Sequence, residues 1–231
     1  MKRILVTGVG RGLGRALAEL YVAQGHRVWG STRSGESDLD LAGCVAMEMS
    51  SEASIIAGID QLASATDAID LLVNCAGTDS RSFGAETSAE RGVFGVNADQ
   101  INGLLAVNVT GPMMVTRAAL RLLQAGDGPM VLNFSSQLGS MEFTRNGGGD
   151  GAYCISKAAL NMFGVQAAAA LRSVGIGVVS LHPGWVQTDM GGAAATMTVT
   201  ESATAIVATS LGLTLADSGR FIRWDGTDHP W

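Results

Sequence analysis

The sequence predicts an α/β protein with one doubly wound parallel sheet of seven strands and helices on both faces. Three observations lead to this class. The chain has 231 residues, which suits a single large core. Short apolar runs alternate with longer runs rich in alanine and leucine. The short runs are apolar throughout, as strands covered on both faces are. We therefore expect one domain over residues 1–231.

Seven strands are expected, joined by helices in right-handed strand–helix–strand units. The strands are expected at residues 3–7, 27–31, 44–47, 71–74, 130–134, 177–181 and 220–224. The helices are expected at residues 12–24, 52–64, 102–123, 152–173 and 201–213. Residues 79–100 fit neither pattern well.

Composition and charge narrow the function classes. Net charge is −6 and no run of basic residues occurs, which argues against nucleic-acid binding. Cys44, Cys75 and Cys154 are odd in number and have no metal-ligand spacing. We expect reduced thiols in a cytoplasmic protein and no metal site. The amino terminus resembles a strand rather than a signal peptide, and no membrane-spanning segment is expected.

A glycine-rich turn, TGVGRGLG at residues 7–14, follows the first expected strand and opens a helix. Glycines in such a turn let the backbone approach a pyrophosphate, and the helix start offers free N–H groups. The spacing is a variant of the common dinucleotide turn, and its position between strand and helix strengthens the interpretation. The expected cofactor contacts here are Gly8, Gly10, Arg11, Gly12, Leu13 and Gly14.

The end of the second strand predicts the form of the dinucleotide. A carboxylate at this place would bind the ribose 2′-hydroxyl of NAD, but the chain has Ser31, Thr32 and Arg33. Arg11 lies in the glycine turn, and two guanidinium groups that converge would suit a 2′-phosphate. NADP(H) is therefore predicted over NAD(H), against the alternative that either arginine is simply solvated.

Tyr153 and Lys157 are one helical turn apart at the start of a long apolar helix. A nearby ammonium lowers a phenol's pKa, so the pair could serve as a general acid/base, although a tyrosine packed beside a solvent-directed lysine is also common. Ser135 and Ser136 follow a buried strand, at the edge where parallel sheets bind ligands, and either could hold a carbonyl oxygen or cap the loop.

Asn108 lies four residues before Pro112 in another apolar helix. Proline has no N–H, so the carbonyl of residue 108 loses its helical donor and a kink is expected there. The freed carbonyl could hold a water molecule, or the kink could serve packing alone.

Taken together, these motifs resemble the short-chain dehydrogenase/reductase family over essentially the whole chain. The turn at 7–14 is similar to its T-G-x-x-x-G-x-G motif, and NCAG at 74–77 resembles N-N-A-G with Cys75 in place of asparagine. Asn108, Ser136, Tyr153 and Lys157 resemble its catalytic tetrad. SKAALNMF, LHPGWVQTDMGG and the closing WDGTDHPW resemble the C-factor/sniffer-like carbonyl reductase branch.

The resemblance implies a Rossmann-type fold and hydride transfer between NADP(H) and a ketone or aldehyde. It implies that Tyr153 transfers the proton, Lys157 lowers its pKa and holds the ribose, Ser136 holds the substrate oxygen, and Asn108 holds a water. It also implies further cofactor contacts at Glu48, Met49, Asn74, Ala76, Gly77, Pro183, Gly184, Val186 and Thr188.

Two other functions compete with carbonyl reduction. A cofactor-binding signalling protein with incidental turnover is compatible with the same residues. A sugar epimerase or dehydratase is disfavoured, because only 42 residues follow Asp189. A homodimer or homotetramer is expected, because residues 158–171 and 104–115 carry no charge and a sheet covers one face of a helix.

Overall fold

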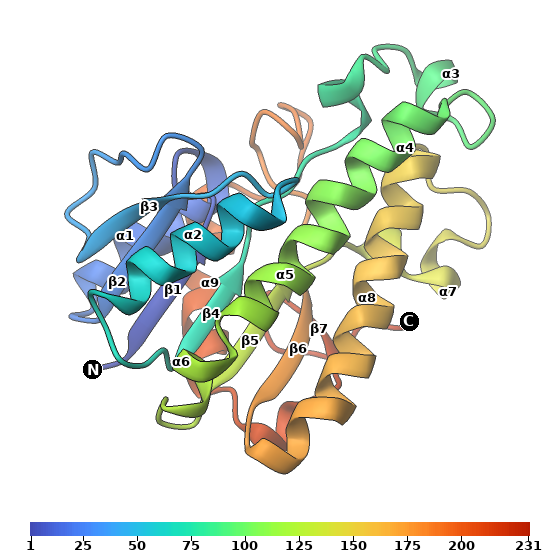
Figure 1. Ribbon diagram of the computed structural model, residues 1–231. Helices are drawn as coiled ribbons and strands as arrows, with labels where there is room; N and C mark the ends of the chain where they lie inside the picture. The colour runs from blue at the N-terminus through green and yellow to red at the C-terminus, as the bar shows by residue number, and fades with distance from the viewer.

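The computed structural model describes all 231 residues and confirms the predicted fold class (Figure 1). Seven parallel strands form one sheet in the order β3-β2-β1-β4-β5-β6-β7. Each strand lies within two residues of its expected bounds. The strands are β1 Arg3–Thr7, β2 Arg27–Thr32, β3 Gly43–Ala46, β4 Leu71–Asn74, β5 Met130–Phe134, β6 Gly177–His182 and β7 Phe221–Arg223.

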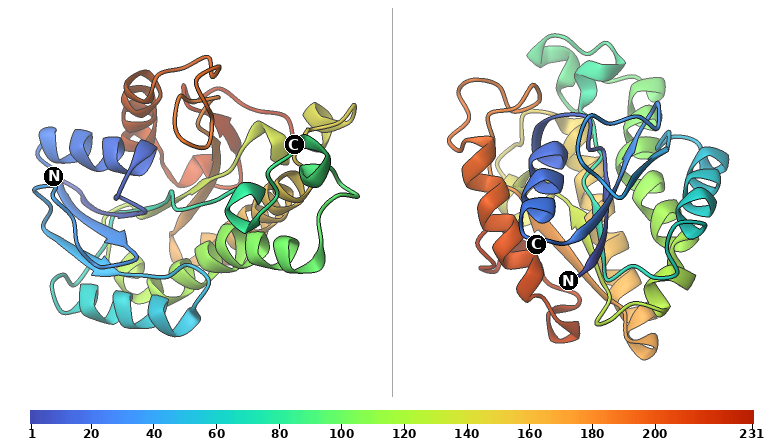
Figure 2. Two further views of the ribbon diagram at one scale, coloured as in Figure 1. Left: turned by 90° about the horizontal axis from the view of Figure 1, so that it is seen from above. Right: turned by 90° about the vertical axis from the view of Figure 1, so that its left-hand side faces the viewer.

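Helices cover both faces of the sheet, as Figure 2 shows from two sides. One face is covered by α1 and α9, which pack on each other and share a buried cluster that includes Leu17 and Ile206. The other face is covered by α2, α5 and α8, with a second cluster that includes Ile55 and Val115. The α-helices are α1 Gly12–Ala23, α2 Glu52–Ala63, α3 Ser88–Arg91, α4 Ala98–Leu105, α5 Gly111–Ala118, α6 Leu120–Gln124, α7 Met141–Thr144, α8 Gly151–Leu171 and α9 Val199–Gly212.

The helix expected at 102–123 is not continuous. It begins at Ala98, widens into a π-helical segment at Ala106–Thr110, and resumes as α5 with Pro112 in its first turn. The missing N–H of Pro112 explains the change, because the wider turn re-forms the ladder around the carbonyl that has lost its donor. The irregularity expected near Asn108 therefore takes the form of a π-helical segment that contains this residue.

Residues 79–100, which the sequence left unassigned, contain the short helices η1, Ser80–Phe83, and α3 before α4 begins. A capping box closes the start of α3, with Thr87 and Glu90 each bonding the other's backbone N–H. In Figure 1 this segment lies above the upper end of the sheet.

Helix α8 has the length and composition of a membrane-crossing helix as well as those of a core helix. In this fold it packs on β6, and Leu160, Gly164 and Ala168 are buried against the rest of the chain. Its other face is exposed, with Ile155 at 42% and Met162 at 57%. Of the four consecutive alanines at 167–170, Ala167 and Ala168 face the core, whereas Ala169 and Ala170 are exposed.

The exposed apolar side of α8 predicts a two-fold dimer or a dimer-based tetramer. Ile155, Met162 and Ala169 are spaced by seven residues and lie along one side of the helix. A second copy would remove this stripe from water. Light scattering at micromolar concentration should show an oligomer, and Met162→Glu should reduce it to a monomer. Ile56→Glu, at the 41% exposed Ile56 of α2, is the matched control and should leave the oligomer intact. A monomeric wild type would contradict the prediction.

Candidate active site

The glycine turn after β1 brings the chain close to the end of β4. Gly8 has a φ of 80°, and a Cβ there would lie 3.0 Å from the Cα of Ala76. A Cβ on Gly14 would collide with the carbonyl oxygen of Gly8. Arg11 precedes α1 without a side-chain cap, so the first N–H groups of α1 remain free for an anion. The turn therefore fits a dinucleotide pyrophosphate.

Buried polar contacts fix the ends of the central strands beneath this turn. The backbone N–H groups of Cys75 and Ala76 both donate to Thr7 Oγ1 at 3.0 Å. Asn74 Nδ2 donates to Asn133 Oδ1 at 2.9 Å and to Thr116 Oγ1 at 3.2 Å. The Asn74 side chain is thus 1% exposed and joins β4 to β5 rather than facing the cleft.

The four residues that resemble a tetrad come together at the carboxyl edge of the sheet. Lys157 Nζ lies 5.6 Å from the centre of the Tyr153 ring and donates to the Phe134 carbonyl at 2.7 Å. Asn108 Nδ2 donates to Ser156 Oγ at 3.0 Å and to the Thr78 carbonyl at 2.8 Å. A Cβ on Gly77 would lie 3.3 Å from Asn108 Oδ1 and 3.6 Å from Lys157 Nζ, so both face the same glycine.

The two serines after β5 differ in their surroundings. Ser135 is 3% exposed, and its hydroxyl points back to the carbonyl of Lys157 at 3.5 Å. Ser136 Oγ accepts from Leu138 N at 3.1 Å, and this hydroxyl counteracts the rise of the Tyr153 pKa. Of the pair, Ser136 is the better placed to share a substrate oxygen with Tyr153.

A net lowering of the Tyr153 pKa beside Lys157 is not observed in this structure. Burial raises the pKa of Tyr153 well above its ordinary value, and the carboxylates of Asp79 and Asp150 add to the rise. Burial also lowers the pKa of Lys157 to about 8. The ammonium is engaged by a carbonyl and does not offset the desolvation of the phenol. At neutral pH the phenol therefore holds its proton.

A cleft of about 350 Å³ lies in front of Tyr153. Its walls come from the glycine turn through Leu13, from the loop after β5 through Ser136, and from the loop after β6 through Trp185 and Thr188. A second cleft, at the end of β2, is lined by Gly10, Ser34, Glu36, Ser37 and Asp38. Because Gly10 and Leu13 belong to one turn, the glycine turn links the two clefts.

The remaining residues that were expected to contact a cofactor lie at the same edge. Gly12 is adjacent to Thr188, whose Oγ1 accepts from Gly191 N at 3.1 Å. Gly184 has a φ of 91°. The Pro183 carbonyl accepts a hydrogen bond from Ser202 Oγ at 2.6 Å. Val186 and Met49 are buried. The carboxylate of Glu48 accepts a hydrogen bond from Ser50 Oγ at 3.1 Å.

The predicted convergence of Arg11 and Arg33 is not observed. Arg11 Nη1 pairs with Asp189 Oδ2 at 2.9 Å, on the loop after β6, four strands away from β2. Arg33 is exposed and forms no ion pair. At the end of β2, Arg15 binds the carboxylate of Asp38 through both terminal nitrogens, at 2.6 and 3.0 Å.

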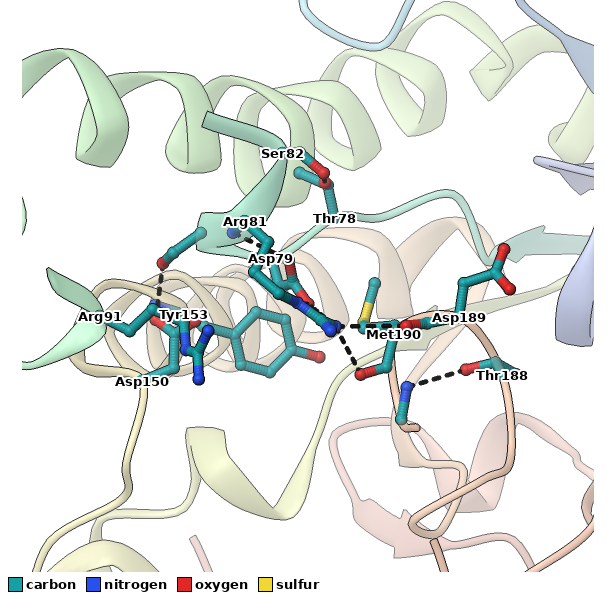
Figure 3. A network of polar contacts seen from close by, with 12 residues as sticks. Thr78, Asp79, Arg81, Ser82, Arg91, Asp150, Tyr153, Thr188, Asp189 and Met190 are labelled. Atoms are coloured by element: carbon teal, nitrogen blue, oxygen red, sulfur yellow. Dashed lines mark hydrogen bonds and ion pairs between the residues drawn. The ribbon is translucent and has the colours of Figure 1, made fainter. Parts of the chain in front are cut away.

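Sequence analysis missed four charged residues that line the cleft: Asp79, Arg81, Arg91 and Asp150. Figure 3 shows them around Tyr153. Asp150 Oδ1 accepts from Tyr153 N at 3.0 Å and from Ser80 Oγ at 2.7 Å, so it caps α8. An aspartate three residues before Tyr153 is a recognisable helix-start signal that could have found it. The other three lie in the segment that showed no periodicity.

The fold and this cleft define an α/β dinucleotide-binding protein, with a Tyr–Lys pair at the carboxyl edge of a doubly wound sheet. The family model for short chain dehydrogenases matches residues 2–198, and the chain belongs to this family of oxidoreductases. It is 42% identical to the C-signal of Myxococcus xanthus over 125 residues, which are 54% of this chain and 75% of that protein.

Two solved structures share the whole fold. The NADPH-bound carbonyl reductase from chicken fatty liver superposes with a TM-score of 0.87 at 27% identity, covering 100% of this chain and 99% of that one. The carbonyl reductase Sniffer of Drosophila melanogaster has a TM-score of 0.86 at 27% identity and full coverage of both chains.

The buried ammonium of Lys157 predicts a pH-dependent stability. Its pKa is about 8 in the folded chain and 10.5 in the unfolded one, so the unfolded state binds more protons between these values. The free energy of unfolding of the wild type, relative to Lys157→Met, should therefore rise between about pH 8 and pH 10.5. Denaturant unfolding across this range tests it, with Lys2→Met, at the other lysine of the chain, as the matched control. A flat difference would contradict the lowered pKa.

Proposed function

We propose that this protein is an NADP(H)-dependent reductase of ketones or aldehydes. The observation that carries the proposal is the cleft in which a protonated phenol, Tyr153, lies beside the Ser136 hydroxyl and next to the glycine turn. Gly8 and Gly14 leave no room for side chains where a pyrophosphate would approach the backbone. The similarity to two carbonyl reductases supports the same reaction class.

In the proposed reaction, Ser136 and Tyr153 together hold the carbonyl oxygen of the substrate. When bound, the reduced nicotinamide would supply the hydride to the carbonyl carbon. Tyr153 gives its proton to the oxygen as negative charge develops there, which completes the alcohol. Lys157, charged at neutral pH, stabilises the resulting phenolate. Asn108 joins the loop after β4 to α8 through Thr78 and Ser156 and keeps both in register.

Tyr153→Phe should separate chemistry from cofactor binding. The change removes one hydroxyl, and the backbone N–H that Asp150 caps is unaffected. Loss of a positioned general acid should lower kcat by about 10²–10⁴-fold, while NADPH affinity measured by fluorescence stays near that of the wild type. Tyr21→Phe is a matched control, because the Tyr21 hydroxyl bonds Ser210 between α1 and α9. Turnover by Tyr153→Phe at the wild-type rate would show that the tyrosine is structural.

The proposed preference for NADP(H) depends on Arg33 rather than on Arg33 and Arg11 together. Arg33 is exposed and unpaired at the end of β2, and Arg15 neutralises Asp38 beside it. The carbonyl reductase from chicken fatty liver, whose structure contains NADPH, supports the choice. Arg11 would contribute only after leaving Asp189. The unpaired carboxylate of Glu36 is the feature that favours NAD(H).

Arg33→Asp should shift the ratio of kcat/KM for NADPH over NADH toward NADH by more than about tenfold, because a charge-assisted phosphate contact is lost and a like charge is added. Steady-state kinetics with both cofactors measure the ratio. Arg121→Asp, at an exposed arginine of α6, controls for net charge. Equal kcat/KM values for the two cofactors in the wild type would defeat the preference.

A second candidate function is a cofactor-binding signalling protein, which the 42% identity to the C-signal favours. One experiment distinguishes the two functions. A wild-type chain that binds NADPH tightly yet reduces no ketone or aldehyde in a broad panel would favour the signalling function. All three cysteines are free, which supports a cytoplasmic setting for either function.

A further inference from the structure

Four charged side chains line the cleft in front of Tyr153, and three of them are already engaged within the chain. Arg81 Nη2 donates to Asp79 Oδ2 at 2.5 Å and to the Met190 carbonyl at 2.7 Å, so both charges of this pair are compensated. Asp150 accepts hydrogen bonds from Ser80 and from the backbone at the start of α8. These three charges hold the walls of the cleft together.

Arg91 is the cation of the cleft that has no anionic partner. Its guanidinium is half-buried, and its one hydrogen bond goes from Nη1 to the backbone carbonyl of Glu86 at 2.7 Å. It belongs to none of the ion pairs of the chain. Most of its five N–H donors therefore have no acceptor, although it lines the same cleft as Tyr153. In Figure 3 the side chain extends toward Tyr153 and Asp150.

The position of Arg91 is fixed by the packing around α3. Thr87 and Glu90 close the start of this short helix with a reciprocal capping box. A Cβ on Gly151, the first residue of α8, would lie 2.8 Å from the backbone nitrogen of Val93. The segment after Arg91 therefore rests directly on the start of the helix that carries Tyr153. This contact holds the backbone of this segment close to the start of α8, and the hydrogen bond to the Glu86 carbonyl holds the guanidinium.

The other walls of the cleft are largely apolar. Leu13, Leu138, Val186 and Met190 contribute aliphatic surface. The indole of Trp185 is held by a hydrogen bond from its Nε1 to the Gly191 carbonyl at 2.9 Å. A substrate that fits must place a carbonyl at Tyr153, an apolar body against these side chains, and an acceptor at Arg91.

We propose that the substrate is a small oxo acid whose anionic group, a carboxylate or a phosphate, binds Arg91. This inference rests on the proposed carbonyl reduction and names its substrate class. A guanidinium fork matches both anions with two parallel hydrogen bonds. The cleft volume of about 350 Å³ fits a small molecule. Arg91 is then a specificity-determining residue and takes no part in proton or hydride transfer.

The test compares substrates that differ in one charge. Levulinate and methyl levulinate share their ketone and carbon skeleton, and hydroxyacetone phosphate and hydroxyacetone form a second pair. In the wild type, kcat/KM for one of the two anions should exceed that for its neutral counterpart by more than about tenfold, mainly through a lower KM. The pair that shows the preference identifies carboxylate or phosphate as the anion.

Arg91→Gln should remove most of this preference, because the neutral amide cannot compensate the anion's charge, and Arg91→Lys should restore part of it. Arg121→Gln, at an exposed arginine outside the cleft, should leave both ratios unchanged. Circular dichroism and NADPH affinity check that the variants fold. A wild type that reduces the neutral ketones but shows no preference for either anion overturns the inference and leaves the proposed function intact. So does a preference that persists in Arg91→Gln.

A wild type that reduces none of the four compounds counts against the proposed function, and a binding measurement then decides on the anion site. Levulinate or hydroxyacetone phosphate is titrated into the NADPH complex, and quenching of the nicotinamide fluorescence is followed. Saturable quenching that Arg91→Gln abolishes supports the site. No saturable binding of either anion overturns it.

Discussion

The ammonium of Lys157 is held in a buried position at the carboxyl end of β5, and the geometry of the cleft depends on this contact. Burying a charge is costly unless it is hydrogen-bonded, and here the Phe134 carbonyl accepts at 2.7 Å. The lysine fixes the start of α8 against the sheet, and Gly77 leaves space for both Lys157 and Asn108. The free-energy cost of burying this charge is reflected in the lowered pKa of Lys157.

The fold could be predicted almost completely from the sequence, because most strands are apolar runs and most connections contain a helix. The roles of Gly8 and Gly14 could also be predicted from the sequence. A side chain at either position would lie too close to neighbouring backbone atoms, so only glycine fits. Tyr153, Lys157, Ser136 and Asn108 were found through spacing and resemblance, and the structure brings them to one edge of the sheet. Their roles remain predictions.

What the sequence could not provide are quantities that depend on burial and on contacts between distant segments. Spacing places Lys157 beside Tyr153, but only the surrounding packing shows that burial raises the pKa of the phenol. The ion pair of Arg11 with Asp189 joins residues 178 positions apart, which no local pattern indicates. Arg81 and Arg91 lie in a segment of short helices whose order comes from capping and packing rather than from periodicity.

The charges that shape the cleft also affect its chemistry. Asp79 and Asp150 are present for structural reasons, since one holds Arg81 and the other caps α8. Both carboxylates nevertheless add to the rise in the pKa of Tyr153 that burial causes. A protonated phenol is the form that can donate to a developing alkoxide, as the proposed reduction requires. Oxidation would first require the phenol to lose its proton, and a cationic cofactor ring near Tyr153 would favour that loss.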